Sequence, residues 1–279
     1  GNDKRYGYID NTGKEITPVQ YERAERFSEG LAGVRLNGKA GFIDKTGKEA
    51  IPFKYDLTLS YSEGLGKVSI RGKDGWKFGY IDKTGKEVIP LKYDNCSDFN
   101  EGVAVVGLNG KYGVIDKTGK EIAPIKYDEI SIFNEGLATV KLNGEYGYID
   151  KTGKEITPIK YYEANGFRGG LAVVKINNKY GYIDKTGKEV TPIKYHYADD
   201  LKEGLGVVWI SGKNGAKKGC VDKTGKEVIP LKYDSISFLS EGVVSVKLNN
   251  KYGFINNAGK VVAPTKYDST SAFNEGLAK

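Results

Sequence analysis

The sequence has few of the residues that enzymes use most often for catalysis or metal binding. Its 279 residues include one histidine, His196, and two cysteines, Cys96 and Cys220. A general base or a metal ligand needs partners, and His196 lies in a predicted loop at a position that holds aspartate in other copies of the internal repeat described below. Neither a nucleophile elbow, nor a P-loop, nor a metal-ligand spacing occurs. We therefore expect a protein that is not an enzyme, with no catalytic residue, cofactor or metal.

The cysteines and the hydrophobic runs give no indication of a disulfide or of a membrane-spanning segment. Cys96 and Cys220 stand at different positions of the repeat, so we expect no disulfide between them. Cys96 replaces a small apolar residue and is expected in the core. No apolar run is long enough to span a bilayer. The first residues, Gly1-Asn2-Asp3-Lys4-Arg5, show no signal-peptide pattern, as would also hold for a mature chain or an excised fragment.

The charged residues are mixed along the chain. Lysine and arginine number 43 against 36 aspartates and glutamates, which gives a net charge of +7 without a run of one sign. This pattern indicates a well-solvated surface and allows an acidic partner. Arginine is the usual reader of phosphates and bases, and only Arg5, Arg23 and Arg26 lie near one another. We do not expect nucleic acid as the ligand.

An internal repeat of about 34 residues organises the whole chain. Shifting the chain so that Gly7 falls on Gly147 also places Gly79 on Gly219, which indicates duplication of a four-repeat block. We therefore predict one array over residues 1–279, made of blocks 1–140 and 141–279. Two repeats are four residues longer, at 71–77 and 211–217, and we expect loops there. The glycine of a Tyr-Gly motif recurs at Gly7, Gly41, Gly79, Gly113, Gly147, Gly181, Gly219 and Gly253, and the eight prolines share another position.

Each repeat predicts antiparallel strands. The run 137–142 is rich in β-branched residues, and Asn143-Gly144 is a strong type I′ hairpin signal. Residues 146–150 form the next strand, and residues 150–153 form a turn in which the aspartate side chain accepts a backbone hydrogen bond. Residues 154–158 form a third strand that the proline ends. We predict a three-stranded meander.

The rest of the repeat contains a tyrosine, a small or apolar residue three positions later, and an aromatic residue or leucine after another three, as in Tyr21, Ala24 and Phe27. This spacing predicts a tight turn and a short extended piece whose side chains enter the core between neighbouring meanders. Stacked meanders then form an all-β open superhelix or solenoid of eight repeats. The alternative is a closed eight-bladed propeller with a shared terminal blade, which would need a fourth strand in each blade.

These motifs carry a resemblance. The pattern Glu-Gly-Leu-Ala, Asn-Gly, Tyr-Gly-Tyr-Ile-Asp, Gly-Lys-Glu and Pro-x-x-Tyr-Asp resembles the WG-repeat family over essentially the whole chain. The resemblance implies a bacterial, non-catalytic repeat module, often at the cell surface or secreted, with no fixed ligand. The tryptophan that names the family is replaced by another aromatic residue in six repeats, and by Ala40 and Lys218 in two, where the aromatic anchor for packing or binding is lost.

The repeated carboxylates and glycines indicate structure rather than chemistry. Catalysis needs one asymmetric pair of carboxylates, whereas the glutamate before the second repeat glycine occurs seven times and is missing only at Gly169. Aspartate ladders can bind calcium, but the nonapeptide of calcium-binding β-helices is absent.

A stripe of tyrosines and lysines is the candidate ligand face. Exposed aromatic rings beside cations could bind a glycan, an acidic polymer or single-stranded nucleic acid, but the pattern favours tyrosines that are core residues covered by the lysines. The two tryptophans are added because they are not shared between copies. The candidate residues are Tyr21, Lys54, Tyr55, Lys92, Tyr93, Lys126, Tyr127, Lys160, Tyr161, Lys194, Tyr195, Trp76 and Trp209.

The sequence therefore predicts a binding or scaffold module. It would present its Tyr/Lys face to a protein or to a polymer of the cell envelope. The alternative is a structural stalk or filament segment that self-associates through exposed end strands.

Overall fold

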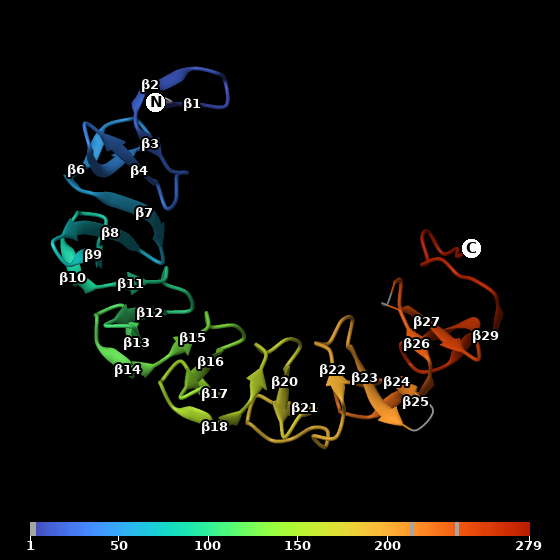
Figure 1. Cartoon of the computed structure of the whole chain (residues 1–279). Coiled ribbons are helices and arrows are strands. Elements are labelled where there is room, and N and C mark those ends of the chain that lie inside the picture. The colour runs from blue at the N-terminus through green and yellow to red at the C-terminus, as the bar shows by residue number, and fades with distance from the viewer. Residues whose placement is uncertain (1–3, 213–214, 238–239) are drawn as a thin grey trace. The chain divides into compact units, whose positions relative to one another are not determined.

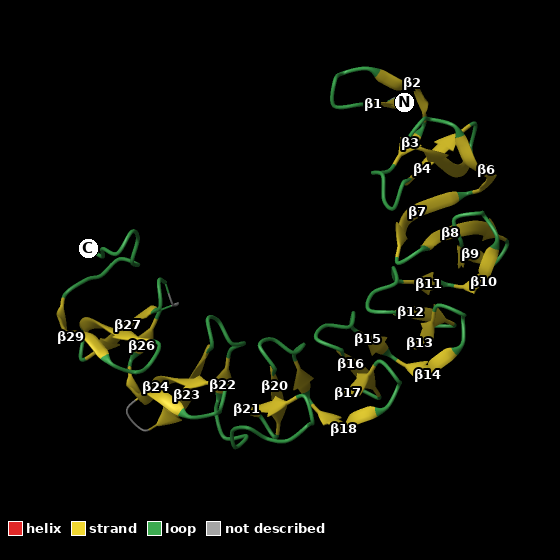
Figure 2. Ribbon diagram, turned by 180° about the vertical axis from the view of Figure 1, so that it is seen from behind, coloured by secondary structure: helices red, strands yellow, loops and turns green. Residues whose placement is uncertain are grey.

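The computed structural model describes residues 4–212, 215–237 and 240–279. All regular structure in these ranges is β-strand, and none is helix (Figure 2). The strands form eight small antiparallel sheets, and the strands of each sheet are consecutive in sequence (Figure 1). No sheet of the described residues closes into a barrel. The prediction of an all-β chain of eight tandem antiparallel repeats is confirmed.

The first compact unit comprises the residues up to Phe133 together with Lys151–Lys154. Its sheets have the orders β1-β2, β3-β4-β5-β6, β10-β9-β8-β7 and β11-β12-β13-β14. The strands of this unit are β1 (Tyr6–Ile9), β2 (Glu15–Tyr21), β3 (Arg23–Ala24), β4 (Leu31–Leu36), β5 (Lys39–Asp44), β6 (Glu49–Tyr55), β7 (Leu57–Ser62), β8 (Leu65–Gly72), β9 (Gly75–Ile81), β10 (Glu87–Tyr93), β11 (Asn95–Cys96), β12 (Val103–Leu108), β13 (Lys111–Asp116), β14 (Glu121–Tyr127) and β15 (Glu129–Ile130).

The second unit comprises Asn134–Asp150 and Glu155–Lys279. Its strands pair in the orders β16-β17-β18, β19-β20-β21, β22-β23-β24-β25 and β26-β27-β28-β29. The strands of this unit are β16 (Leu137–Leu142), β17 (Glu145–Asp150), β18 (Glu155–Tyr161), β19 (Glu163–Ala164), β20 (Leu171–Ile176), β21 (Lys179–Asp184), β22 (Tyr197–Ala198), β23 (Leu205–Gly212), β24 (Gly215–Asp222), β25 (Glu227–Tyr233), β26 (Ser235–Ile236), β27 (Val243–Leu248), β28 (Lys251–Asn256) and β29 (Val261–Tyr267).

The predicted hairpin turns form as expected. Asn143 and Gly144 both have positive φ, 54° and 87°, as a type I′ turn requires. In the turn between β1 and β2, the Asp10 carboxylate accepts hydrogen bonds from the Thr12 and Lys14 N–H groups. These bonds, with one from the Thr12 hydroxyl, hold the pKa of Asp10 below its ordinary value.

The proline does not end its strand, so that prediction was wrong. In β18 the strand continues through Pro158 to Tyr161, and the pairing with β17 shifts between Thr157 and Tyr161. The extra residues form a bulge, where the missing N–H of proline leaves no ladder bond unmade. The same bulge in β10 explains the repeat glycine, because a Cβ at Gly79 would lie 2.6 Å from the Ile89 carbonyl oxygen.

The meander has a fourth strand, which corrects the prediction of three. The piece after the repeat tyrosine contains a two-residue strand that pairs with the next long strand, as Glu163 and Ala164 pair with Lys175 and Val174. Two residues are too few to show an alternating pattern. In one repeat this strand is longer and forms β7.

The core lies between consecutive sheets of each unit. One cluster joins Tyr80, Ile89 and Tyr93 to Phe99 and Val106 of the next sheet. Tyr148 and Phe167 pack edge to face at 5.0 Å in the same way, and the Tyr148 hydroxyl donates to the Asn165 carbonyl. The predicted entry of these aromatic side chains into the core is confirmed. Cys96 and Cys220 are buried and unpaired.

Candidate binding surface

The tyrosines of the predicted Tyr/Lys face lie in the core. Tyr21, Tyr55, Tyr93, Tyr127, Tyr161 and Tyr195 are buried. Lys54, Lys92, Lys126, Lys160 and Lys194 are exposed, and each places its ammonium group 4.9–5.3 Å from the ring centroid of the next tyrosine. The lysines cover the rings, and no face of these rings is open to a ligand in this conformation.

The two tryptophans stand on the longer hairpins. The additional residues lengthen the strands β8, β9, β23 and β24 and do not form loose loops, although Lys213 and Asn214 lie outside the described residues. Trp76 is 38% exposed, and the Arg71 guanidinium lies 5.8 Å from its ring. Trp209 is half-buried and contacts other aromatic residues.

The residue that follows the repeat tyrosine forms an ion pair and accepts a backbone hydrogen bond, and we call these two contacts together a clasp. In regular repeats this residue is an acid, and it pairs with a lysine that lies 17 residues earlier, in the strand before the one that ends at the tyrosine, as Asp56 pairs with Lys39 at 2.6 Å. The second oxygen of Asp56 accepts a bond from the Arg71 N–H of the following hairpin at 2.8 Å. The ion pair lowers the pKa of Asp56. The same clasp occurs in Lys77–Asp94, Lys111–Asp128, Lys217–Asp234 and Lys251–Asp268.

Two adjacent clasps in the second unit are irregular. In one, Glu145 replaces the lysine and Tyr162 replaces the acid, so no ion pair can form. In the other, His196 replaces the acid and lies 2.6 Å from the Lys179 ammonium. The Ser211 N–H donates to Nδ1 of His196, so the proton of a neutral imidazole sits on Nε2 and faces Lys179. A carboxylate accepts from both the lysine and the backbone N–H of a regular clasp, whereas a neutral imidazole can accept only one of these two bonds.

A continuous line of rings covers the same region. Tyr180 and Tyr197 lie 5.9 Å apart, Tyr197 stacks on Trp209 at 6.3 Å, and Trp209 stacks on His196 at 5.7 Å with an interplanar angle of 9°. Tyr162 extends the line, because the Lys175 ammonium lies 5.2 Å from its ring and 4.9 Å from that of Tyr180. We call Tyr162, Tyr180, Tyr197, Trp209 and His196, with Lys175, the aromatic row.

Polar groups fix the geometry of the row. The Glu163 carboxylate accepts from Lys175 at 2.7 Å and from the Tyr180 hydroxyl at 2.9 Å. The bond from Lys175 lowers the pKa of Glu163 and raises that of Lys175. Tyr162 is 66% exposed and Tyr197 is 40% exposed, so ring surface is open to solvent here. Beside Tyr162 lies a recess of about 340 Å³, lined by Glu145, Lys160, Tyr162, Ile176, Asn177 and Asn178.

The family model of the WG containing repeat matches eight segments, at residues 6–39, 41–73, 78–112, 112–146, 146–180, 180–213, 219–252 and 252–279. The chain belongs to the WG-containing repeat family. A search of curated proteins found no match.

Solved structures similar to this chain share little sequence with it. One is Hsv2 of Kluyveromyces lactis, at 9% identity and a TM-score of 0.35, over 82% of this chain and 90% of the other. The AfRom2 CNH domain shares 10% identity at a TM-score of 0.34, over 79% and 88% of the two chains. The extracellular domain of BT3049 from B. thetaiotaomicron shares 10% at 0.28, over 93% and 48%. These low TM-scores carry no information about function.

Two WG repeats lack an aromatic residue at the family's tryptophan position, and in one of them Trp209 supplies the ring. In the fifth repeat Lys175 pairs across the strands with Tyr180, whereas in the sixth Trp209 pairs with Lys218. The cation and the ring have exchanged places. The prediction placed a loss of packing at Lys218, but the ring is supplied from the opposite strand.

Four rings of the aromatic row, together with Lys175, were not among the candidate residues predicted from the sequence of this WG repeat array. Tyr162 and His196 were visible as the two departures from an acid after the repeat tyrosine. Tyr180 and Tyr197 come together only through the stacking of consecutive sheets, which residue spacing does not reveal. Within the described residues, no three His, Cys, Asp or Glu side chains gather to hold a metal ion. The described part of the chain also has no helix able to span a membrane.

Proposed function

We propose that this WG repeat array is a non-catalytic binding module that presents a long regular surface to a protein or to a polymer of the cell envelope. The observation that carries the proposal is the loss of two adjacent clasps where the aromatic row is exposed. Regular repeats cover their hairpin edges with ion pairs, and here that cover is replaced by ring surface and a recess. Exposed aromatic residues that repetition does not explain indicate a binding site.

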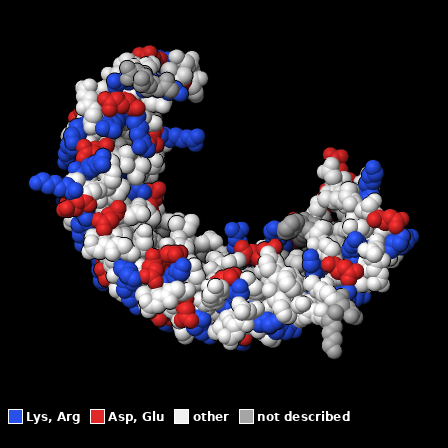
Figure 3. All heavy atoms as spheres, in the orientation of Figure 1, with Lys and Arg blue, Asp and Glu red and all other residues white. Residues whose placement is uncertain are grey.

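The rest of the surface fits a scaffold. Lysines and acids alternate over the face seen in Figure 3 without a large area of one sign. The exposed lysines above the buried tyrosines form part of this mixed surface, and we propose that they contribute solubility and weak attraction to acidic groups of a polymer.

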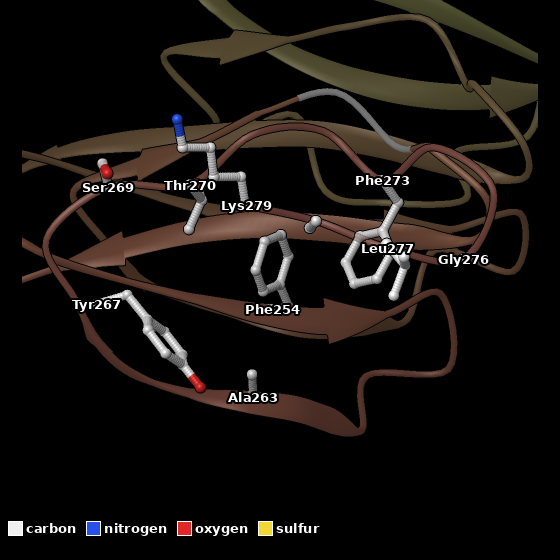
Figure 4. Close-up of a pocket in the computed structure, with 10 residues that line it drawn as sticks. Phe254, Ala263, Tyr267, Ser269, Thr270, Phe273, Gly276, Leu277 and Lys279 are labelled. Carbon is white, nitrogen blue, oxygen red and sulfur yellow. The ribbon is translucent and has the colours of Figure 1, made fainter.

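A second candidate is a structural stalk whose ends associate. In the last repeat, Tyr267 is 42% exposed, whereas the equivalent Tyr161 is 1% exposed beneath the next sheet. A recess of about 280 Å³ opens there, lined in part by Phe254, Phe273 and Leu277 (Figure 4). A strand of a second copy could cover this surface.

Sedimentation of the chain over a range of concentrations, together with binding to an array of glycans and envelope proteins, tests the proposal. A binding module stays monomeric and binds at least one class of polymer or protein. A chain that assembles with concentration and binds nothing on the array overturns the proposal and supports the stalk.

A further inference from the structure

We propose that the aromatic row binds a neutral glycan chain built of β-linked pyranose rings. This inference rests on the proposed binding function and names its ligand class. The faces of aromatic rings carry negative charge and attract the polarised C–H groups on the flat side of a pyranose ring. Tyr162 and Tyr197 expose ring surface at separate points of the row, so different units of one chain can contact them.

The geometry of the row suits an extended ligand. Each ring lies 5.7–6.3 Å from the next along Tyr180, Tyr197, Trp209 and His196. Trp209 and Tyr197 are within 19° of parallel, and His196 and Trp209 within 9°. The stack is held by cross-strand pairing of Tyr197 with Trp209, so the platform forms before any ligand binds.

The recess beside Tyr162 supplies hydrogen bonds for hydroxyl groups. Asn177 and Asn178 each offer amide donors and an acceptor, and the Glu145 carboxylate accepts. Glu145 takes the place of the lysine of a regular clasp and Tyr162 the place of its acid, and both line the recess. Donors and acceptors close to an exposed ring are what a polyhydroxylated ligand requires.

The charges at the row disfavour a phosphate-rich ligand. The Lys175 ammonium is engaged by the Glu163 carboxylate, which compensates its charge. Glu145, beside Tyr162, and Glu163, bonded to the Tyr180 hydroxyl, would repel phosphates at this end of the row. Bases stacked on these rings would therefore bring their phosphates close to carboxylates, where single-stranded nucleic acid needs cations.

Calorimetric titration of the full chain tests the inference, with cellohexaose, chitohexaose, maltohexaose and a dT oligonucleotide as ligands. We expect binding of cellohexaose or chitohexaose, whose chains present flat faces, and weaker binding of the curved maltohexaose. Trp209→Ala should weaken binding by about tenfold or more. Trp76→Ala, which removes an exposed ring outside the row, should leave binding unchanged.

A second variant guards against a folding defect. The double exchange Trp209→Lys with Lys218→Tyr reproduces the arrangement of Lys175 and Tyr180 in the fifth repeat, and should fold and lose binding as Trp209→Ala does. The inference is overturned if neither β-linked oligomer binds at millimolar concentration, if both Trp209 variants bind normally, or if only the oligonucleotide binds. Binding of the oligonucleotide alone would contradict this inference but would still agree with the proposed binding function. Assembly of the chain without binding of any ligand would contradict the proposed binding function as well.

Discussion

The Glu63 carboxylate accepts a hydrogen bond of 2.9 Å from the Gly102 N–H of the next repeat. The same carboxylate pairs with Lys117, one repeat further on, at 3.0 Å. Glu63 and Gly64 form a two-residue turn with φ of 53° and 89°. Glutamate rarely adopts this conformation. The strained turn persists because it aims the carboxylate at two successive repeats, as Glu29 and Glu135 do within their own units.

Substitutions at Glu63 should separate the stabilisation by its two side-chain contacts from the cost of its backbone conformation. Glu63→Ala loses both bonds and keeps the unfavourable φ, so its free energy of unfolding should fall by about 1 kcal/mol after allowance for solvent screening. Glu63→Gly loses the same bonds but relieves about 1 kcal/mol of backbone strain, and should come close to wild type. Urea denaturation measures both. Equal destabilisation by alanine and glycine would show that the backbone conformation costs nothing.

The repeat glycine at position 79 should tolerate no side chain. A Cβ there would lie 2.6 Å from the Ile89 oxygen and 2.8 Å from the Leu91 nitrogen, both backbone atoms. Gly79→Ala should therefore lower the free energy of unfolding by about 3 kcal/mol or more, because the bulge must move. Gly166→Ala is the matched control, since no atom lies within 4 Å of its Cβ. Thermal melts in which the two variants behave alike would refute the close approach.

The buried tyrosines should set the alkaline limit of stability. Burial raises the pKa of Tyr80, Tyr148 and Tyr182, and raises the pKa of Tyr8 and Tyr195 to about 12. The folded state therefore favours the neutral phenol. The stabilisation is fully present below pH 10, the ordinary value, and is lost as pH rises above it. Tyrosinate absorbance and circular dichroism should change together on alkaline titration. Complete ionisation of all tyrosines before any loss of β signal would contradict this.

Restoring an acid at position 196 should stabilise the folded chain. His196→Asp gives Lys179 the carboxylate partner that Lys39 has in Asp56 and should raise the free energy of unfolding by about 0.5 kcal/mol. His196→Ala removes the imidazole without adding a partner. Calorimetry should place the aspartate variant above the wild type and the alanine variant at or below it, and the reverse order would show that the histidine clasp is already satisfied.

Local signals in the sequence predicted much of the fold. Asn143-Gly144 and the turn at Asp10 depend only on the φ and side-chain chemistry of a few neighbouring residues, and both formed as predicted. The strand through Pro158 was missed because the bulge depends on how closely Gly147 approaches the partner strand. The two-residue strand at Glu163 was too short to show a period. The candidate site depends on contacts between repeats, and of the residues named from sequence only Trp209 belongs to the aromatic row and only Lys160 to the adjoining recess.

The duplication of a four-repeat block stays a proposal. It would make the hairpins that carry Trp76 and Trp209 equivalent by descent. Their surroundings differ, with Arg71 beside one ring and Tyr197 beside the other. We propose that the second copy acquired the binding residues after duplication.

The most direct test of ligand binding at the interrupted clasps is a variant that restores the regular clasp at the recess. The double variant E145K/Y162D places a lysine opposite an aspartate, as in Lys39 and Asp56. An exposed ion pair contributes about 0.5 kcal/mol, so the variant should unfold at the same denaturant concentration as wild type or a slightly higher one. The same variant removes the ring and the acceptor that the ligand would contact. We predict a chain of undiminished stability whose affinity for the β-linked oligomer falls by about tenfold or more. Unchanged affinity in this stable variant would contradict the claim that ligand binds where the clasps are interrupted.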